Sequence, residues 1–443
     1  MISESEIRLA KDCLSMALKA GAQKARVNLV LDRMNLVSTL DAQIDKCSSC
    51  FDRSIRISVF ADGKFGAFST NKLEKKSLEA FIAKAVDTVK MLAPDPCRDL
   101  PAQDRVQKDA VTGRELDLLD ETYYTIDGKQ RKETALAACL GKAPGKIKLV
   151  SEEGEYSDNI YDTLIVDSQG TFCRQTETSF EYFCEVTVED ENGEKYSAYD
   201  WAESPRFATL PWKEVSRNAY EKACAMTGAR NCRGRRCNMV VDREVASKFV
   251  SPILRALRGD NIQQHNSFLE GKEGIKVFPD GMTIVDCGAR KGESNCILFD
   301  DEGVAAKEHV IIDRGTVKEY FLNTFSANKM GKEPTCDGPV RPRLMGWPRA
   351  ALTRDDILEM CKEGILVTEF NGGNTNTATG DFSFGIEGFV FKKGKIAYPV
   401  KEMLVTGNIV ELWSNLIACG DDSRSCMSKL IPTLAFSNVD FNG

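Results

Sequence analysis

The chain has 443 residues, of which 42% are hydrophobic and 28% are charged, and its formal net charge is −7. The length predicts about two or three domains, and the composition is typical of a globular protein. The negative charge disfavours bulk attraction to nucleic acid, and no apolar run approaches the roughly 18 residues of a membrane span. Early charged residues are atypical of a secretory signal. With sixteen cysteines, we therefore expect reduced thiols and a cytoplasmic location.

The amino-terminal part of the chain predicts a helix, several strands and a second helix. Ser3 and Glu6 have the spacing of a capping box, and Gly21 suits the end of that first helix. Strands are expected over 25–31, 36–40, 55–60 and 66–69, with an Asp62-Gly63 hairpin turn between the last two. An apolar stripe predicts the second helix over 74–92. This order indicates an α+β unit.

Cys47 and Cys50 have the C-x-x-C spacing of dithiol redox sites and of zinc half-sites. They lack the strand–motif–helix context of a redox site, and Cys232 with Cys237 is too loosely spaced to supply a second zinc pair. We therefore interpret Cys47 and Cys50 as structural residues, and the sequence leaves their redox state open.

The middle of the chain changes from loop to strands. Residues 94–128 lack periodicity and predict a connecting loop, which a helix over 131–140 follows. Further strands are expected over 146–150, 161–166, 171–176, 180–188 and 195–201, and a helix over 212–226. The segment GARNCRGRRC at 228–237 contains four arginines and is the clearest boundary. We therefore predict domains over 1–228 and 237–443, with 229–236 as a basic linker.

The carboxy-terminal half predicts mainly strands. A strand over 238–241 and a helix over 243–257 precede a loop-rich section over 259–281 and a hairpin around Arg314-Gly315. A helix over 355–361, a strand over 365–369 and a polar loop over 371–377 come next. Apolar alternation then runs over 382–400, and its phase slips at Gly388, which predicts a β-bulge. A last helix is expected to begin at Asn408.

The stretch 379–408, TGDFSFGIEGFVFKKGKIAYPVKEMLVTGN, resembles the signature of the TldD/PmbA family, also called modulators of DNA gyrase. The blocks 300–304, 311–315 and 321–327 resemble the same family. The resemblance implies an α+β fold of two units, an amino-terminal α/β layer and a carboxy-terminal β-rich unit. It also implies that family members pair into two-fold dimers.

The TldD branch of this family resembles a zinc protease because one helix carries His-Glu-x-x-x-His. Aligning that helix with this chain places Val250 and Arg255 at the two ligand positions and Ser251 at the general-base position. Valine cannot ligate, and a cationic arginine repels a divalent ion. Cys426 lies near the position of a further cysteine ligand. These degenerate positions resemble the PmbA/TldE branch, so we predict neither catalytic residues nor a metal site here, and expect zinc in a TldD-type partner.

The leading hypothesis is a non-catalytic, TldE-like subunit of a TldD/TldE metalloprotease that acts on small unfolded peptides in the cytoplasm. The expected partners are a TldD-like subunit, a peptide held by strand addition and, for the isolated chain, a second copy. Two alternatives stay open: a self-sufficient metal-dependent peptidase with ligands distant in sequence, and a DNA gyrase-modulating binding protein. Lone histidines such as His265 and His309 are more often structural than catalytic. Candidate peptide-channel residues are His265, Asn371, Asn374, Gly380 and Asp381.

Overall fold

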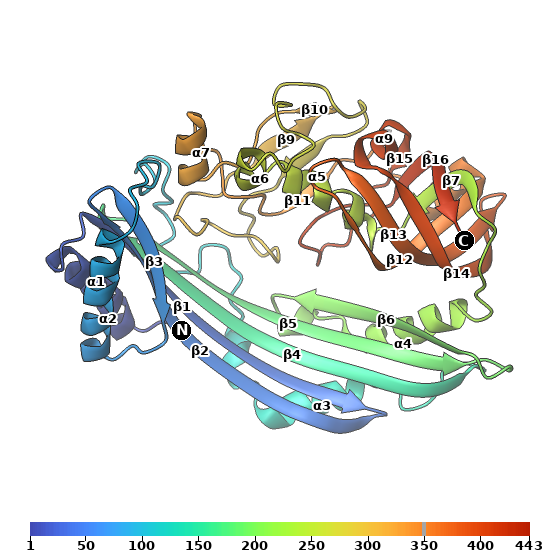
Figure 1. Ribbon diagram of the computed structural model, residues 1–443. Coiled ribbons are helices and arrows are strands. Elements are labelled where there is room, and N and C mark those ends of the chain that lie inside the picture. Colours follow the sequence, from blue (N-terminus) through green and yellow to red (C-terminus); the bar gives the residue numbers. More distant parts are fainter. Residues whose placement is uncertain (348–350) are drawn as a thin grey trace.

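A long, arched antiparallel sheet carries the amino-terminal half of the chain, and a carboxy-terminal unit lies over one face and one end of it (Figure 1). The computed structural model describes residues 1–347 and 351–443. The fold is α+β with two units, as predicted. Among the described residues, none of the helices has the length and apolarity that crossing a membrane requires.

The arched sheet has the strand order β3-β2-β1-β4-β5-β6, and every neighbouring pair is antiparallel. Its strands are β1 (Lys24–Leu40), β2 (Gln43–Ala61), β3 (Lys64–Thr70), β4 (Lys148–Asp167), β5 (Phe172–Glu189) and β6 (Lys195–Ser204). The predicted Asp62-Gly63 turn is confirmed, because both residues have positive φ, 53° and 67°, and join β2 to β3.

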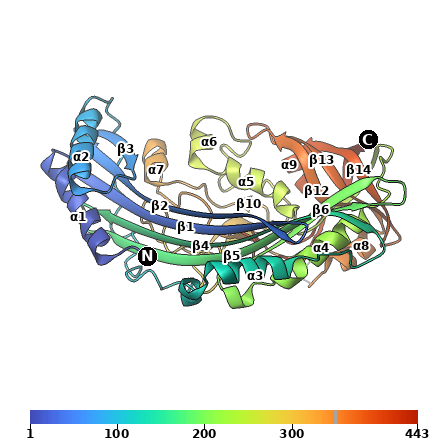
Figure 2. The ribbon, with the colours of Figure 1, turned by 90° about the horizontal axis from the view of Figure 1, so that it is seen from below.

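One face of this sheet packs against four helices (Figure 2). They are α1 (Glu4–Lys19), α2 (Lys75–Lys90), α3 (Gly128–Ala138) and α4 (Trp212–Ala225), and 3₁₀ helices cover Glu121–Thr125 and Phe207–Thr209. The predicted capping box of Ser3 and Glu6 is present at the start of α1. Alternate residues of β1, such as Val27 and Leu29, are buried beneath these helices.

Buried ion pairs stabilise the helix-covered face. Asp158 and Asp162 have no exposed side-chain surface, and they pair with Arg131 at 2.6 Å and Arg174 at 2.7 Å. Both carboxylates lie on β4, which is one strand of twenty residues where the sequence predicted two shorter runs. The prediction relied on apolar residues at alternate positions, and the buried Asp158 and Asp162 interrupt that pattern in the middle of β4.

Cys47 and Cys50 both lie on β2 and are exposed. Successive side chains of a strand alternate between faces, so residues three apart point to opposite faces and lie about 10 Å apart along the strand. The two thiols therefore cannot share a metal ion or form a disulfide with each other in this conformation.

Short elements connect the arched sheet to the carboxy-terminal strands. A small sheet has the order β10-β9-β8-β11, and three short helices precede or follow its strands. These elements are α5 (Ser251–Ala256), α6 (Gly259–Gln263), β8 (Ile284–Asp286), β9 (His309–Asp313), β10 (Thr316–Val317), α7 (Thr324–Met330) and β11 (Pro342–Leu344), with a 3₁₀ helix over Ala246–Phe249. The helix predicted over 243–257 is thus divided into two, the 3₁₀ helix over Ala246–Phe249 and α5. The division falls where it does because Pro252 lies at the start of α5.

The carboxy-terminal strands close into a barrel. Their order is β14-β13-β12-β7-β16-β15, and β14 pairs again with β16, so the sheet curls back on itself. The elements are β7 (Arg235–Val241), α8 (Arg354–Cys361), β12 (Glu363–Thr375), β13 (Asp381–Lys392), β14 (Lys395–Asn408), α9 (Ile409–Ser414), β15 (Leu416–Cys419) and β16 (Leu434–Asn442). A bulge was predicted within β13 at Gly388, but the burial of alternate residues in β13 continues through Gly388. The register does shift there, because β12 and β14 each carry an extra residue opposite this part of β13.

Two sequence predictions differ from the observed strands. Arg235 and Arg236, which were assigned to a basic linker, begin β7, and they pair with Phe441 and Asp440 of β16. The loop predicted from residue 371 is strand as far as Thr375, with a register shift after Phe370. Glycines and asparagines read as a loop in the sequence, but here they accommodate the shift within a paired strand.

Candidate functional site

The three positions that the sequence assigned to a degenerate metal motif, 250, 251 and 255, lie at and around the start of α5. Val250 is completely buried and precedes α5, Ser251 is its first residue and half-buried, and Arg255 is exposed one turn later. Phe249 packs against a group of phenylalanine rings at centroid distances of 5.3 to 6.1 Å, from Phe370, Phe382, Phe384 and Phe436. This helix start is therefore packed as core structure.

The side chains at these positions do not fit a zinc ion. Val250 offers no donor atom, Ser251 offers only a hydroxyl, and Arg255 brings a positive charge. Across residues 1–347 and 351–443, no group of three or more His, Cys, Asp and Glu side chains could hold a metal ion. Cys426 lies in the loop between β15 and β16, where its carbonyl accepts a bond of 3.4 Å from Asn295 Nδ2.

Two of the segments predicted to line a peptide channel, around His265 and Gly380, meet beside α5. The Phe268 N–H donates to the Thr377 carbonyl at 3.0 Å, and a Cβ on Gly380 would lie 3.4 Å from the Phe268 ring. His265 lies in the same turn after α6, is exposed, has a φ of 54°, and bonds Glu270 through Nδ1 at 2.7 Å. The structure thus places Gly380, which is buried, close to the turn that carries the exposed His265.

Asp381 has a structural partner set. It accepts bonds from Asn408 Nδ2 at 2.9 Å and from Thr379 Oγ1 at 2.7 Å. The bond from Asn408, with that from Thr379, lowers the pKa of the Asp381 carboxyl. Asn408 also caps α9. The carboxylate therefore ties the start of β13 to the end of β14.

Asn371 and Asn374 lie on β12 and are exposed. Asn371 Nδ2 donates to Glu387 Oε1 of β13 at 3.1 Å, and Asn374 pairs with Ser383. Their exposure leaves the remaining hydrogen-bonding groups of both amides free to contact a ligand.

A cluster around His309 was not predicted as a unit. His309 on β9 bonds Glu319 through Nδ1 and Asp286 through Nε2, the latter at 3.4 Å, and Cys336 adjoins it. Burial alone lowers the pKa of His309, but bonds to Asp286, Cys336 and Glu319 raise it to about 12. Asp286 also accepts backbone bonds from Val340 and Arg341, both at 2.7 Å. His309 is therefore a half-buried cation that joins the small sheet to the following loops.

The sheet face opposite the helices is acidic. This face contacts the carboxy-terminal unit, since Gln175 Nε2 donates to the Cys296 carbonyl at 3.3 Å. Glu181 on β5 lies directly opposite Glu203 on β6. Burial raises the pKa of both carboxyls, and neighbouring carboxylates raise both pKa values further: Glu155 that of Glu181, and Glu181 with Glu177 that of Glu203. Sequence periodicity could not reveal this, because the residues come from separate strands.

Comparisons with known proteins agree with this architecture. Family models of the PmbA/TldA metallopeptidase match the chain over residues 71–227, for the central domain, and 234–443, for the C-terminal domain. The metalloprotease PmbA of Escherichia coli O157:H7 is 23% identical over 442 residues, which cover 97% of this chain and 96% of that protein. The PmbA homologue of Haemophilus influenzae is 26% identical, with 95% and 92% covered.

Solved structures match over nearly the full length. A candidate modulator of DNA gyrase from Bacteroides thetaiotaomicron superposes with a TM-score of 0.95, 33% identity and 100% of both chains covered. TldE from Thermococcus kodakarensis shares the fold with a TM-score of 0.80, at 18% identity and with 98% and 100% covered. The chain therefore belongs to the PmbA/TldD metallopeptidase family.

Proposed function

We propose that this chain is a non-catalytic, TldE-like subunit of a two-chain metalloprotease in which a TldD-like partner holds the zinc. The observation that supports the proposal is the packing around Val250: a core valine and an exposed Arg255 lie at the positions that we assign to the ligands of the family's motif. A single substitution could not restore the site, because a zinc ligand set generally needs about three protein side chains.

The proposed substrate is a small unfolded peptide bound in an extended conformation. Strand addition suits this role, because backbone hydrogen bonds tolerate varied side chains. His265, Asn371 and Asn374 are exposed and can contact such a peptide, whereas Asp381 is engaged with Thr379 and Asn408. The proposed location is the cytoplasm, which suits a chain whose sixteen cysteines are free.

Metal content and peptidase activity of the purified chain test the proposal. We expect no zinc at stoichiometric level and no hydrolysis of an unstructured peptide by the chain alone, and chelator-sensitive hydrolysis when a TldD-type partner from the same cell is added. The partner alone is the control for its own activity. Stoichiometric zinc with chelator-sensitive hydrolysis by the lone chain would contradict the proposal and support a self-sufficient peptidase.

The same purified chain tests self-pairing. We propose that, without its partner, the chain forms a two-fold dimer. Its mass by light scattering over a range of concentrations gives the oligomeric state, and a monomer at every concentration would reject this part of the proposal.

A further inference from the structure

The outer edge of β2 is only partly covered. β3 pairs with β2 over residues 55–61, and within the described part of the chain no strand pairs with the outer edge of residues 43–54. Figure 1 shows β2 running along the border of the arched sheet. An uncovered edge presents backbone N–H and C=O groups that can pair with another chain.

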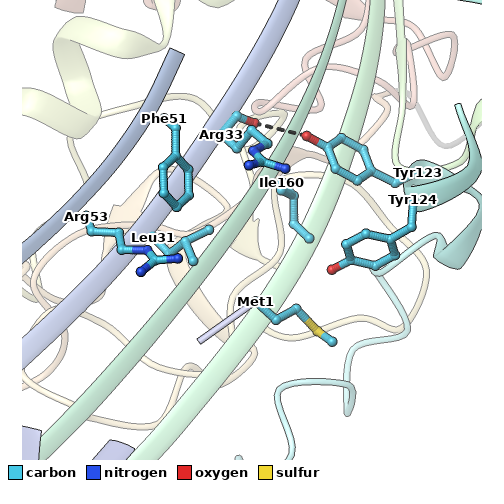
Figure 3. Close-up of a pocket in the computed structure, with 8 residues that line it drawn as sticks. All are labelled: Met1, Leu31, Arg33, Phe51, Arg53, Tyr123, Tyr124 and Ile160. Carbon is cyan, nitrogen blue, oxygen red and sulfur yellow. Dashed lines mark hydrogen bonds between the residues drawn. The ribbon is translucent and has the colours of Figure 1, made fainter. Parts of the chain in front are cut away.

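Both faces of the sheet are open beside this edge. Residues 45, 46, 47, 49, 50, 51, 52 and 53 are all exposed, although they lie in the interior of a strand. Phe51 is 45% exposed, and the guanidinium groups of Arg33 and Arg53 stack on its ring at 4.9 and 4.6 Å. These side chains line a pocket whose volume is about 90 Å³. Figure 3 shows Tyr123 and Tyr124 on the other side of this pocket. This pocket lies on the sheet face that carries the helices.

Geometry limits how two copies of this edge can pair. Along an edge strand, alternate residues point their backbone N–H and C=O groups outward. In an antiparallel pair related by a two-fold axis, each outward-pointing residue must face another outward-pointing residue. The axis must therefore pass through a residue and not between two residues. This excludes the register in which Cys47 faces Cys50 of the second copy.

Among the remaining registers, the charges favour the axis at Ser49. Lys46 then faces Asp52 of the second copy, and symmetry repeats the contact. Asp45 is left out of this register, because it is the extra residue of a bulge against β1. Moving the axis to Ser48 places Lys46 opposite Cys50 and Asp52 opposite Ile44. Moving it to Cys50 places Arg53 opposite Cys47 and Asp52 opposite Ser48. Opposite charges facing each other across strands stabilise the pair.

A repulsion inside the chain also favours a cation opposite Asp52, on the free edge of β2. Asp52 lies directly opposite Asp32 of β1. Burial and the charge of Asp52 raise the pKa of the Asp32 carboxyl. Like charges facing each other are destabilising, and a lysine on the free side of Asp52 relieves that repulsion. Arg53, in contrast, already pairs with Glu6 at 2.9 Å.

We propose that residues 46–52 of β2 form the self-association surface of this chain, where a second copy pairs antiparallel about a two-fold axis at Ser49. The two arched sheets then form one continuous sheet across the axis. This inference rests on the self-pairing in the proposed function and names its surface.

Charge reversal tests the register. Lys46→Asp alone, or Asp52→Lys alone, places like charges opposite each other twice per dimer, and we expect dimer dissociation to become at least about tenfold easier. The double variant, Lys46→Asp with Asp52→Lys, restores the opposite charges and should regain the wild-type dissociation constant. Lys393→Asp, in the exposed β13–β14 turn, is the matched control and should behave as wild type. The dissociation constants come from sedimentation equilibrium.

A cysteine at the axis gives an independent measurement. In a Cys47→Ser, Cys50→Ser background, Ser49→Cys should form a covalent dimer under mild oxidation, whereas Lys393→Cys in that background should not. A wild-type dimer that neither responds to charge reversal nor crosslinks at residue 49 would overturn this inference and leave self-pairing intact. A monomeric wild type would overturn both.

Discussion

Asp300 carries a carboxylate that folding places in an unfavourable environment. It lies in the tight turn where its Oδ1 accepts backbone bonds from Glu302 at 2.9 Å and Val304 at 3.0 Å. Burial, with a contribution from the Glu302 charge, nevertheless raises the pKa of Asp300 to about 6. The Asp300 carboxyl therefore binds its proton more tightly in the folded protein than in the unfolded chain, where the pKa of an aspartate is about 3.9.

This difference predicts a pH dependence of stability. The contribution of Asp300 to the free energy of unfolding should fall as pH rises from about 4 to 6, because the folded state must lose a proton that the unfolded state has already lost. Asp300→Asn keeps the accepting oxygen and removes the charge. We expect it to be more stable than wild type by about 3 kcal/mol at pH 7 and similar to it at pH 3. Urea unfolding at both pH values measures the difference.

The exposed neighbour provides the control. Asp301→Asn removes the same charge one residue away and should leave the pH profile of wild type unchanged. A parallel profile for Asp300→Asn and wild type between pH 4 and 7 would show that Asp300 does not carry the effect.

Single residues set a clear limit to prediction from the sequence. The proposed replacement of the motif's histidines by Val250 and Arg255 could be inferred from the sequence alone, because the motif lies within one short segment. The cluster of His309 with Asp286, Glu319 and Cys336 is not visible, because its members come from four separate segments and share no spacing. Only the folded arrangement of the small sheet brings them together.

At the scale of elements, two hairpin turns with the same backbone differ in their surroundings. Asp62-Gly63 and Arg314-Gly315 both have positive φ at two successive residues. A Cβ on Gly63 would meet nothing within 4 Å, whereas a Cβ on Gly315 would lie 1.9 Å from the Phe278 carbonyl oxygen. Glycine avoids backbone strain at both positions. Only at Gly315 is there also no room for a Cβ, because the backbone of Phe278 lies too close.

Alanine at these positions separates the two effects. Gly63→Ala should cost about 1 kcal/mol of unfolding free energy, from the left-handed conformation alone. Gly315→Ala should cost about 3 kcal/mol, because the backbone around Phe278 must also move. Chemical denaturation of both variants gives the comparison, and equal losses would contradict the role assigned to the close approach.

The lengths of the strands were harder to predict than their existence. The runs at 25–31 and 36–40 are one strand, β1, because the charged Asp32 and Arg33 between them lie where the sheet is open to solvent. The segment after Phe370 was predicted as a loop from its glycines and asparagines. Pairing with β13 decides its conformation, and that pairing is not a local property of the sequence.

At the scale of the whole molecule, the two units share an apolar cluster. Leu298 and Phe299 of the carboxy-terminal half pack with Ile165 and Cys173 of the arched sheet, and with Val106 of the long connection. Val106 also forms a β-bridge with Val304. Because each side buries its apolar surface against the other, we expect the two units to unfold together.

Calorimetry tests this coupling. The wild-type chain should show one thermal transition, and Leu298→Ala should lower its stability by about 3 kcal/mol through the cavity that it leaves. Ile396→Ala, which truncates a side chain that is 47% exposed, is the matched control and should have little effect. Two separate transitions in the wild type would contradict the coupling.

The closure of the barrel by β16 imposes an order on folding during synthesis. All six strands of the arched sheet lie before residue 205, so this sheet can assemble while the rest of the chain is still being made. β7, by contrast, pairs with β12 and with β16, which begins only at Leu434. Contacts between such distant segments form slowly. The strands of the unfinished barrel therefore stay exposed until the last of them emerges from the ribosome, and a chain stalled before that point becomes a substrate for chaperones or proteolysis.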